Sequence, residues 1–278
     1  MKALFDEICD RCSEITTSSY STSFSLGIKL FDKPLRKPIY AIYGFVRFAD
    51  EIVDTFHEYD KEDLLNRFEE DTYRAIEDKI SLNPILNSFQ RVVNTYDIDH
   101  ELIDTFLKSM RMDLGNYKYD EESLQEYILG SAEVVGLMCL KVFCNGDQSQ
   151  YDNLKKYAMS LGAAFQKINF LRDLNADFKE LGRSYFPEID LNKFDQESKE
   201  RIEQSIEIDF KEGHIGIMKL PRSAKFGVYL AYVYYYSLFR KIQKTKPSKV
   251  LDARIRIPNK QKYAILASSY VKYRLNLI

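Results

Sequence analysis

The sequence predicts an all-α protein in which helices surround a central space within one domain, residues 1–278. Three observations predict this fold. Glycine and proline, which interrupt helices, number only 11 and 7 in 278 residues. Long segments without them place apolar residues three and four positions apart. No run of useful length alternates apolar and polar residues as a half-buried strand does, and no repeat, low-complexity stretch or linker divides the chain.

The predicted helices are separated by short segments that favour turns. Breaks are expected at FDKP (31–34), LNP (82–84), CNGD (144–147) and FPEID (186–190), because Pro, Gly, Asn and Asp favour turns and helix caps. Helical spacing of apolar residues then predicts the elements between the breaks. These helices are expected at residues 3–17, 21–29, 36–54, 61–79, 84–95, 99–113, 122–144, 149–180, 196–211, 222–243 and 260–275.

The overall charge is that of an ordinary soluble protein, with a net charge of −2 and 29% charged residues, which does not suggest a nucleic-acid binder. The charge is unevenly distributed, however. Residues 58–78 hold nine acids against three bases, and residues 240–278 hold eleven bases against the single acid Asp252. Two interpretations of this basic end stay open: it touches anionic lipid or a diphosphate, or it is a solvated tail.

Cysteine usage and the lack of a targeting pattern predict a cytoplasmic protein. Cys9 and Cys12 form a CxxC, but no second pair follows at zinc-site spacing. These two and the remaining cysteines, Cys139 and Cys144, are therefore expected to be reduced. The N-terminus is charged and mixed, unlike a signal peptide. The longest uncharged run, residues 226–239, is too short to span a bilayer, so any membrane contact is expected to be peripheral, at the inner surface.

Three predicted helices carry a narrow polar stripe within apolar surroundings. Residues at i, i+4, i+7 and i+11 share one face of a helix. In the segment AIYGFVRFADEIVDT (41–55) and in the later helices, these positions hold polar or small side chains while their neighbours are apolar. The first stripe is Tyr43, Arg47, Asp50 and Asp54; the second is Gly162, Gln166, Asn169, Asp173 and Asp177; the third is Tyr127, Ser131, Val134 and Met138.

A polar stripe is usually a solvent-facing surface, but two features argue against that interpretation here. The exposed-looking segment 60–71 is rich in Lys and Glu, whereas the first two stripes use Asp, Asn, Gln and Tyr, which suit a fixed geometry. Aspartates four apart on a helix also repel each other unless a cation lies between them. Mg²⁺ takes oxygen ligands from one or two carboxylates together with substrate phosphates, so two facing pairs would suit it.

Other catalytic classes lack support in the sequence. The chain has no Walker loop, no GxGxxG and no GxSxG. The three histidines, His57, His100 and His214, show no ligand spacing, and each is expected to be a surface or structural residue.

The stripes and the segments around them resemble the squalene/phytoene synthases, which are head-to-head prenyl synthases of the all-α isoprenoid synthase fold. The resemblance covers residues 18 to about 260. The most specific match is GAAFQKINFLRDLNADFKELGRSYFP (162–187), which has Q-x-x-N-x-x-R-D followed by G-R-x-Y-x-P. The other matching segments are SSYSTSFSLGIKLF (18–31), RKPIYAIYGFVRFADEIVDT (36–55), MRMDLGNYKY (110–119) and YILGSAEVVGLM (127–138).

The resemblance implies a reaction and its metal. Two allylic diphosphates would join head to head through a cyclopropylcarbinyl diphosphate, with Mg²⁺, or alternatively Mn²⁺, drawing off diphosphate to create an allylic cation. The metal would be held by Asp50, Asp54, Asp173 and Asp177. Tyr43 and Arg47 complete the expected catalytic set. The protein is expected to act on two prenyl diphosphate molecules, without nucleic acid, as a monomer or weak homodimer.

The resemblance also implies which side chains contact the substrate. Arginines would neutralise phosphate charge, polar residues would lie near the substrate heads, and aromatic faces would stabilise cations. Core packing is the competing interpretation of the aromatic residues. The register among the four tyrosines near Tyr235 is left open. The expected substrate-binding residues are Ser21, Phe24, Arg47, Tyr127, Ser131, Val134, Gln166, Asn169, Arg172, Arg183, Tyr185 and Tyr235.

Three positions depart from the family pattern. Glu133 stands where the family usually has glycine, and the helical wheel predicts that it points out of the cavity. Ala176 stands where the family usually has an acid, which would remove an outer contact to metal or water. The chain is also one residue longer than usual between Asp177 and Arg183, which leaves the role of that arginine open.

The leading functional hypothesis is conversion of two geranylgeranyl diphosphates to phytoene in carotenoid biosynthesis. The first alternative is the same chemistry on farnesyl diphosphate, giving dehydrosqualene, or squalene if NADPH serves as reductant. An alternative of another class is a non-catalytic relative that serves as an assembly or binding factor. If the protein were only a helical scaffold, both aspartate pairs would be a coincidence.

Overall fold

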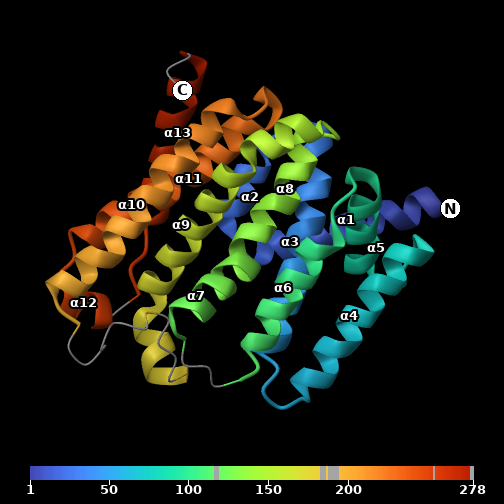
Figure 1. The fold of residues 1–278 in the computed structure, drawn as a ribbon. Coiled ribbons are helices and arrows are strands. Elements are labelled where there is room, and N and C mark those ends of the chain that lie inside the picture. Colours follow the sequence, from blue (N-terminus) through green and yellow to red (C-terminus); the bar gives the residue numbers. More distant parts are fainter. Residues whose placement is uncertain (116–118, 182–185, 187–193, 253, 276–278) are drawn as a thin grey trace.

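The structure, a computed structural model, describes residues 1–115, 119–181, 186, 194–252 and 254–275, without the side chains of 175–181 and 259. All regular elements in these ranges are helical, which confirms the all-α prediction (Figure 1). The elements are α1 (Lys2–Tyr20), α2 (Thr22–Ile28), α3 (Lys33–Asp54), α4 (Lys61–Asp78), α5 (Pro84–Tyr96), α6 (His100–Met112), α7 (Glu121–Ile128), η1 (Leu129–Glu133), α8 (Val134–Cys144), α9 (Gln148–Leu181), α10 (Gln196–Lys219), α11 (Arg222–Gln243), α12 (Pro247–Asp252) and α13 (Asn259–Arg274).

Several helix starts follow from local chemistry that the sequence shows. The Asn83 side chain accepts a hydrogen bond from the Ile85 backbone N–H at 3.0 Å, and proline stands at the first position of α5. Asp60 caps α4 in the same way, through the backbone N–H of Asp63 at 3.0 Å. Such caps satisfy backbone donors that have no partner within the helix.

Three helices extend three or more residues beyond their predicted limits, the first being α1, which was predicted to end at residue 17 and ends at Tyr20. Helix α3 starts at Lys33, because proline at the beginning of a helix supports it rather than breaking it. Helix α10, which was expected to end at residue 211, continues to Lys219 through Gly213 and Gly216. A Cβ on Gly216 would lie 2.3 Å from Cβ of Tyr157 in α9, so this glycine permits close helix packing.

The predicted helix 122–144 contains a π-helical turn that could not be predicted from its sequence. Residues Leu129–Glu133 form one π-helical turn, η1, between α7 and α8. A Cβ on Gly130 would lie 2.6 Å from both Cβ of Ser109 and the carbonyl oxygen of Thr105, so this turn packs directly on α6. A π turn adds a residue to the helix and rotates everything that follows it.

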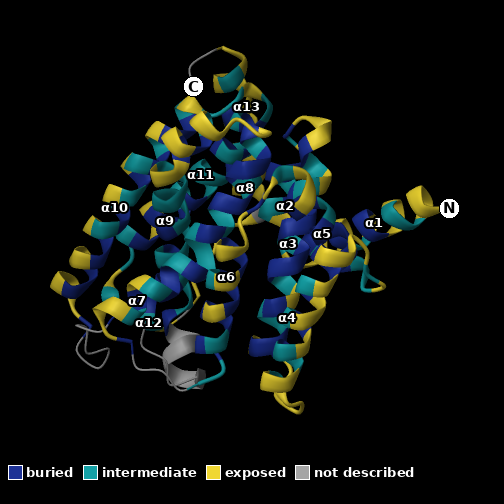
Figure 2. Cartoon of the chain, turned by 45° about the vertical axis from the view of Figure 1, so that its right-hand side comes forward, coloured by how far each residue is buried: buried dark blue, intermediate teal, exposed yellow. Residues whose placement is uncertain are grey.

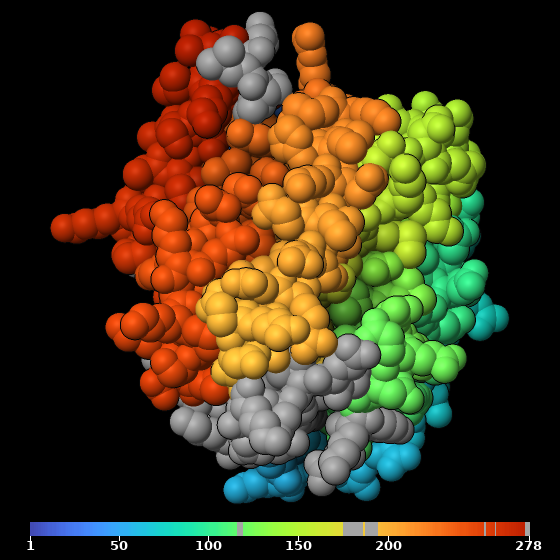
Figure 3. All heavy atoms as spheres, turned by 60° about the vertical axis from the view of Figure 1, so that its left-hand side comes forward, coloured from blue at the N-terminus to red at the C-terminus, as the bar shows by residue number. Residues whose placement is uncertain are grey.

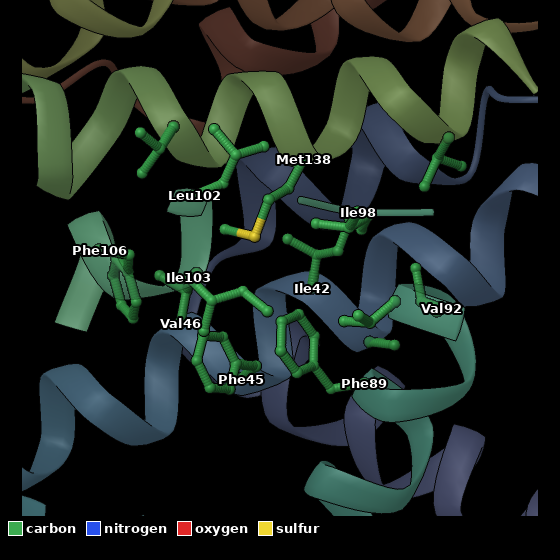
Figure 4. Close-up of a cluster of buried hydrophobic side chains, with 14 of the residues drawn as sticks. Ile42, Phe45, Val46, Phe89, Val92, Ile98, Leu102, Ile103, Phe106 and Met138 are labelled. Carbon is green, nitrogen blue, oxygen red and sulfur yellow. The ribbon is translucent and has the colours of Figure 1, made fainter. Parts of the chain in front are cut away.

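The helices enclose two hydrophobic clusters. The first joins α3, α5, α6 and α8: Phe45 stacks on Phe89 at 3.9 Å and contacts Phe106 at 5.4 Å, beneath Met138 (Figure 4). The second joins α7, α9, α10 and α11 around Phe210. Helix α8 packs against both α3 and α9. Buried residues accordingly lie on the sides of the helices that face inward (Figure 2).

One helical stretch among the described residues, Glu121–Cys144, is long and apolar enough to cross a membrane by length and composition alone. In the fold, 61% of its apolar window is buried by the surrounding helices. The burial matches what a core helix shows.

Candidate active site

A cavity of about 770 Å³ lies between the two hydrophobic clusters. It is lined by residues of α2, α3, α6, α8, α9, α10 and α11, and it has a polar end and an apolar end. Asp50 and Asp173 mark the polar end, near the C-terminus of α3 and toward the C-terminal part of α9. Phe31, Phe143 and Leu154 mark the apolar end. Asp173 stands nineteen positions after Leu154 in α9, a distance of about 28 Å along a helix.

All members of the first stripe line the cavity: Tyr43, Arg47, Asp50 and Asp54. Asp50 keeps 30% of its side-chain surface accessible because it faces this hollow. Burial, together with the nearby carboxylates of Asp54 and Asp113, raises the pKa of Asp50 to about 7, although Arg47 acts in the opposite direction. Burial is the largest cause of this raised pKa, and the neighbouring carboxylates add to it.

Arg47 occupies the centre of this carboxylate group. Its guanidinium pairs with Glu51, lies 3.6 Å from a carboxylate oxygen of Asp50, and stacks over the ring of Tyr20 at 4.2 Å. Its buried Nε makes no hydrogen bond among the described residues. Although burial opposes its charge, the hydrogen bond with Glu51 and the nearby carboxylates raise the pKa of Arg47 further, so it stays a cation.

The members of the second stripe whose side chains the structure describes also face the cavity. Gly162, Gln166, Asn169 and Asp173 line the wall, while the side chain of Asp177 lies outside the described residues. Asp173 is held by two arginines: Nη2 of Arg172 lies 2.6 Å from one carboxylate oxygen, and Nε of Arg254 lies 2.7 Å from the other. Two arginines, one from α9 and one from the segment before α13, thus pair with Asp173 at the polar end.

Two site residues were missed because neither belongs to a stripe. Asp113 follows the end of α6, is 5% exposed, and accepts a 2.8 Å hydrogen bond from the hydroxyl of Tyr127. Arg254 lies between α12 and α13. The available signals were the acid within MRMDLGNYKY and the basic composition of the C-terminal end.

His57 and Lys61 also line the cavity, at its polar end. Nδ1 of His57 lies 3.4 Å from Nζ of Lys61, which donates a 2.8 Å hydrogen bond to the carbonyl of Val53. His57 is exposed, as expected, but its place beside the carboxylates was not foreseen.

The third stripe requires a correction. Tyr127 and Ser131 line the cavity, but Val134 is 2% exposed and packs in the first hydrophobic cluster. The prediction that Val134 forms the cavity wall is therefore wrong. The extra residue of the π turn rotates α8, so that Val135 and Cys139 occupy the wall instead.

Aromatic side chains gather at the middle of the cavity. The ring of Phe24 lies 4.4 Å from that of Tyr43, and Tyr235 stacks on Phe165 at 4.1 Å. This position settles the register of the tyrosine-rich helix, because Tyr235 faces the cavity and its hydroxyl lies 3.4 Å from Oδ1 of Asn169. Burial raises the pKa values of both Tyr43 and Tyr235, so both phenols stay neutral.

The other predicted positions have different outcomes. Ser21 caps α2 by accepting a hydrogen bond from the Phe24 backbone N–H at 3.3 Å, and it is not part of the cavity wall. Glu133 points out of the cavity, as the wheel predicted, toward Lys167 and Asp209. The remaining predicted positions, Arg183, Tyr185 and the side chain of Ala176, lie outside the described residues.

Glycines permit close packing around the apolar part of the cavity. Gly27, Gly136 and Gly227 belong to its wall. A Cβ on Gly227 would lie 2.3 Å from the ring of Phe31, which itself lies 5.2 Å from the ring of Phe143. These two rings and Gly227 form a closely packed end to the apolar part.

The chemical type of the donor atoms at the polar end fits Mg²⁺. The donor set consists of carboxylate oxygens, which this hard cation prefers. Burial, and after it the nearby carboxylate of Asp54, raises the pKa of Asp50. Among the side chains that the structure describes, no group of three or more His, Cys, Asp or Glu is arranged to hold a metal alone.

Comparisons with known proteins agree on one family. The family model of squalene/phytoene synthase matches residues 17–261. The chain is 27% identical over 263 residues to phytoene synthase 1, chloroplastic, of Solanum lycopersicum, covering 86% of this chain and 62% of that protein. It is 32% identical over 197 residues to phytoene synthase, chloroplastic, of Daucus carota, covering 68% and 48%. The chain thus spans less than two thirds of the length of these relatives.

Solved structures share the fold. A dehydrosqualene synthase in complex with ligand superimposes with a TM-score of 0.81 at 20% identity, over 97% of this chain and 98% of that chain. The squalene synthase HpnC from Alicyclobacillus acidocaldarius gives a TM-score of 0.73 at 22% identity, over 86% and 93%. At these identities the likeness establishes the architecture.

Proposed function

Because the chain belongs to the squalene/phytoene synthase family, we propose that it is a prenyltransferase that joins two allylic prenyl diphosphates head to head. The observation that carries this proposal is the cavity itself. Its polar end combines carboxylates with arginines, and its apolar end extends along α8 and α9. An allylic diphosphate has the same division into a charged head and a long apolar tail.

We propose geranylgeranyl diphosphate as the substrate and phytoene as the product. The curated relatives named phytoene synthases support this choice, at 27% and 32% identity. Farnesyl diphosphate is the second candidate. The structures named dehydrosqualene synthase and squalene synthase favour it only through their shared fold. A squalene product would also require NADPH, so reductant is part of the test.

Different residues at the polar end would bind the diphosphate and the metal. Arg47, Arg172 and Arg254 offer guanidinium groups at the polar end, and such groups bind phosphate oxygens with two parallel hydrogen bonds. When bound by Asp50, Asp54, Asp173 and Asp177, Mg²⁺ or Mn²⁺ would supply electrostatic stabilisation of the leaving diphosphate. The arginines hold that same group at the polar end, so the allylic carbon lies toward the aromatic residues.

The aromatic and apolar walls would stabilise the allylic carbocation and hold the prenyl tails. The faces of Tyr43, Phe24 and Tyr235 present negative π density to a developing carbocation. Neutral phenols suit this role because a phenolate would capture the cation. Val135, Cys139 and Phe143 continue the wall toward the apolar end, where prenyl tails would lie away from water.

Product analysis tests the proposal. The protein is incubated with Mg²⁺ and either the C20 or the C15 diphosphate, with and without NADPH, and the hydrocarbons are identified by mass spectrometry. Phytoene from the C20 substrate is expected. Asp54→Asn and Asp173→Asn should each abolish turnover while the helical circular dichroism spectrum persists.

The outcomes separate the hypotheses. A C30 product alone would replace the C20 assignment and retain the chemistry. No product from either substrate would favour the non-catalytic binding factor, and full activity in either variant would remove that aspartate from the metal site.

We further propose a cytoplasmic protein that is a monomer or weak homodimer. The reduced cysteines expected from the sequence support the first part: the structure describes all four as free thiols. Sedimentation velocity of the purified chain measures the second.

A further inference from the structure

The cavity opens to solvent where α3 ends and α4 begins. Asp54, His57 and Lys61 all line it, yet Asp54 and His57 are exposed and Lys61 is partly exposed. The connection between the two helices forms the lower edge of the molecule (Figure 1), and its blue atoms reach the surface there (Figure 3). We call these three residues the cavity mouth. A ligand that enters or leaves the polar end on this side passes them.

Lys61 differs from the other cations that line the cavity. Each of the arginines at the polar end lies within ion-pair distance of a carboxylate; they are Arg47, Arg172 and Arg254. Nζ of Lys61 instead donates a 2.8 Å hydrogen bond to the carbonyl of Val53 and lies 3.4 Å from Nδ1 of His57. No carboxylate among the described side chains pairs with Lys61. Its positive charge is therefore available to an anion without the loss of an existing ion pair.

The contact between Lys61 and His57 fixes how both groups can act. An ammonium group has three N–H donors and no acceptor, so Nδ1 of His57 accepts in this contact. The proton of the neutral imidazole ring is then on Nε2, which becomes a donor. Lys61 uses one N–H on Val53 and one on His57, and it keeps the third. The cavity mouth thus presents N–H donors together with an unpaired positive charge, which is the chemistry of an anion site.

The acids around the start of α4 are engaged elsewhere. The carboxylate of Asp60 accepts a 3.0 Å hydrogen bond from the backbone N–H of Asp63, which caps the helix. The carboxylate of Asp63 in turn lies 3.5 Å from Nη1 of Arg67. Glu58 and Glu62 are exposed, so water and salt screen their charge. These acids therefore leave the lysine of the cavity mouth unpaired.

We propose that Lys61 and His57 bind a diphosphate group at the cavity mouth. A lysine ammonium binds phosphate oxygens as a point charge, and the imidazole adds a hydrogen bond from Nε2. The choice of diphosphate rests on the proposed function, in which two prenyl diphosphates enter the cavity and two inorganic diphosphates leave it. The group bound here is either the head of a substrate or the released inorganic diphosphate, which share the same phosphate oxygens.

This site is distinct from the arginines around Asp173. Arg172 belongs to α9 and Arg254 to the segment before α13, whereas Lys61 begins α4 and His57 precedes it. The polar end therefore offers cationic groups on separate elements of the fold. Two such sets suit a reaction that handles two diphosphate groups.

Isothermal titration calorimetry with inorganic diphosphate in the presence of Mg²⁺ tests the site without turnover. Lys61→Gln removes the charge but keeps an N–H donor for the carbonyl of Val53, and it should weaken diphosphate binding about tenfold. Lys61→Arg retains the charge and should keep most of the affinity. His57→Ala removes the Nε2 donor and should weaken binding about threefold.

A matched control distinguishes this site from general charge. Lys155 is exposed on α9 beside Leu154, at the apolar end of the cavity, so Lys155→Gln should bind diphosphate as the wild type does. Circular dichroism confirms that each variant folds. The proposal is overturned if the wild type does not bind inorganic diphosphate, if Lys61→Gln binds it as tightly as the wild type, or if Lys155→Gln loses as much affinity.

Steady-state kinetics with the prenyl diphosphate separates the two sources of the bound group. A raised KM with unchanged kcat in Lys61→Gln assigns the site to the substrate head. Weaker inhibition by inorganic diphosphate, with KM unchanged, assigns it to the released group. Absence of any prenyl product would overturn the proposed function and leave the calorimetric result intact, whereas normal turnover without a change in diphosphate binding would overturn this site alone.

Discussion

Asp50 illustrates how one residue acquires unusual behaviour from its neighbours. It lies on an apolar helix, faces the cavity, and has two further carboxylates, Asp54 and Asp113, near it. Each like charge makes ionisation of the others more costly in this partly desolvated place. Such an arrangement is unfavourable for stability, and a bound cation would relieve it. The residue-scale evidence thus favours a binding role over a structural one.

Glu133 offers a residue-scale test that is separate from the proposed reaction. Burial and the carboxylate of Asp209 raise its pKa to about 7, while Lys167 acts in the opposite direction. The folded state therefore holds this proton more tightly than the unfolded chain. Stability should fall as pH rises from the ordinary value of 4.5 through about 7, and the penalty is complete above that range.

Glu133→Gln should accordingly raise the melting temperature by about 2–4 °C above pH ~8 and leave it unchanged below pH ~4, because glutamine carries no charge. Thermal unfolding followed by circular dichroism across this range measures the effect. The exposed Glu122→Gln serves as control and should show no such trend. A difference that stays constant with pH would contradict the account.

Sequence reasoning at this scale succeeded where residues share a regular helix. The wheel placed Tyr43, Asp50 and Asn169 toward the cavity and Glu133 away from it, and the structure confirms each position. It could not place Arg254, which lies in a segment between two helices. No periodicity exists there, so only the folded chain brings this arginine to Asp173.

At the scale of elements, the π turn η1 decides which side of α8 meets the cavity. Its five residues do not indicate a π turn in the sequence, because the same residue types would be acceptable in an α-helix. The reason for the turn is tertiary: Gly130 brings its backbone against α6. Helix starts and ends were largely predictable from caps, prolines and glycines, whereas this register shift was not.

A pair of adjacent valines tests the register directly. Val134→Ala should lower the free energy of unfolding by about 1–3 kcal/mol, because Val134 is in the core, and leave the cavity unchanged. Val135→Phe should alter stability little but reduce kcat/KM about tenfold or more, because the larger ring enters the cavity.

Chemical denaturation and steady-state kinetics of both variants measure these effects. A helix without the π turn would give the opposite pattern, with Val134→Phe blocking the cavity and Val135→Phe disrupting the core.

At the scale of the whole molecule, the cavity exists because two hydrophobic clusters form on either side of it. Its polar end collects charges from α3, α6, α9 and the segment before α13, and its apolar end is closed by Phe31 and Phe143. The family, the fold and the polar end could be predicted from local motifs. The depth of the apolar end could not, since side chains from several helices set it jointly. For that reason the choice between C20 and C15 requires measurement.

The central claim is that diphosphate binds at the carboxylate–arginine end while the prenyl tail follows α8 toward Phe143. A crystal structure with Mn²⁺ and an unreactive thio analogue of geranylgeranyl diphosphate tests it most directly. The account predicts anomalous density for the metal beside Asp50, Asp54 and Asp173, with the tail in contact with Val135 and Cys139. Metal and diphosphate bound elsewhere, or a tail outside this cavity, would contradict the account.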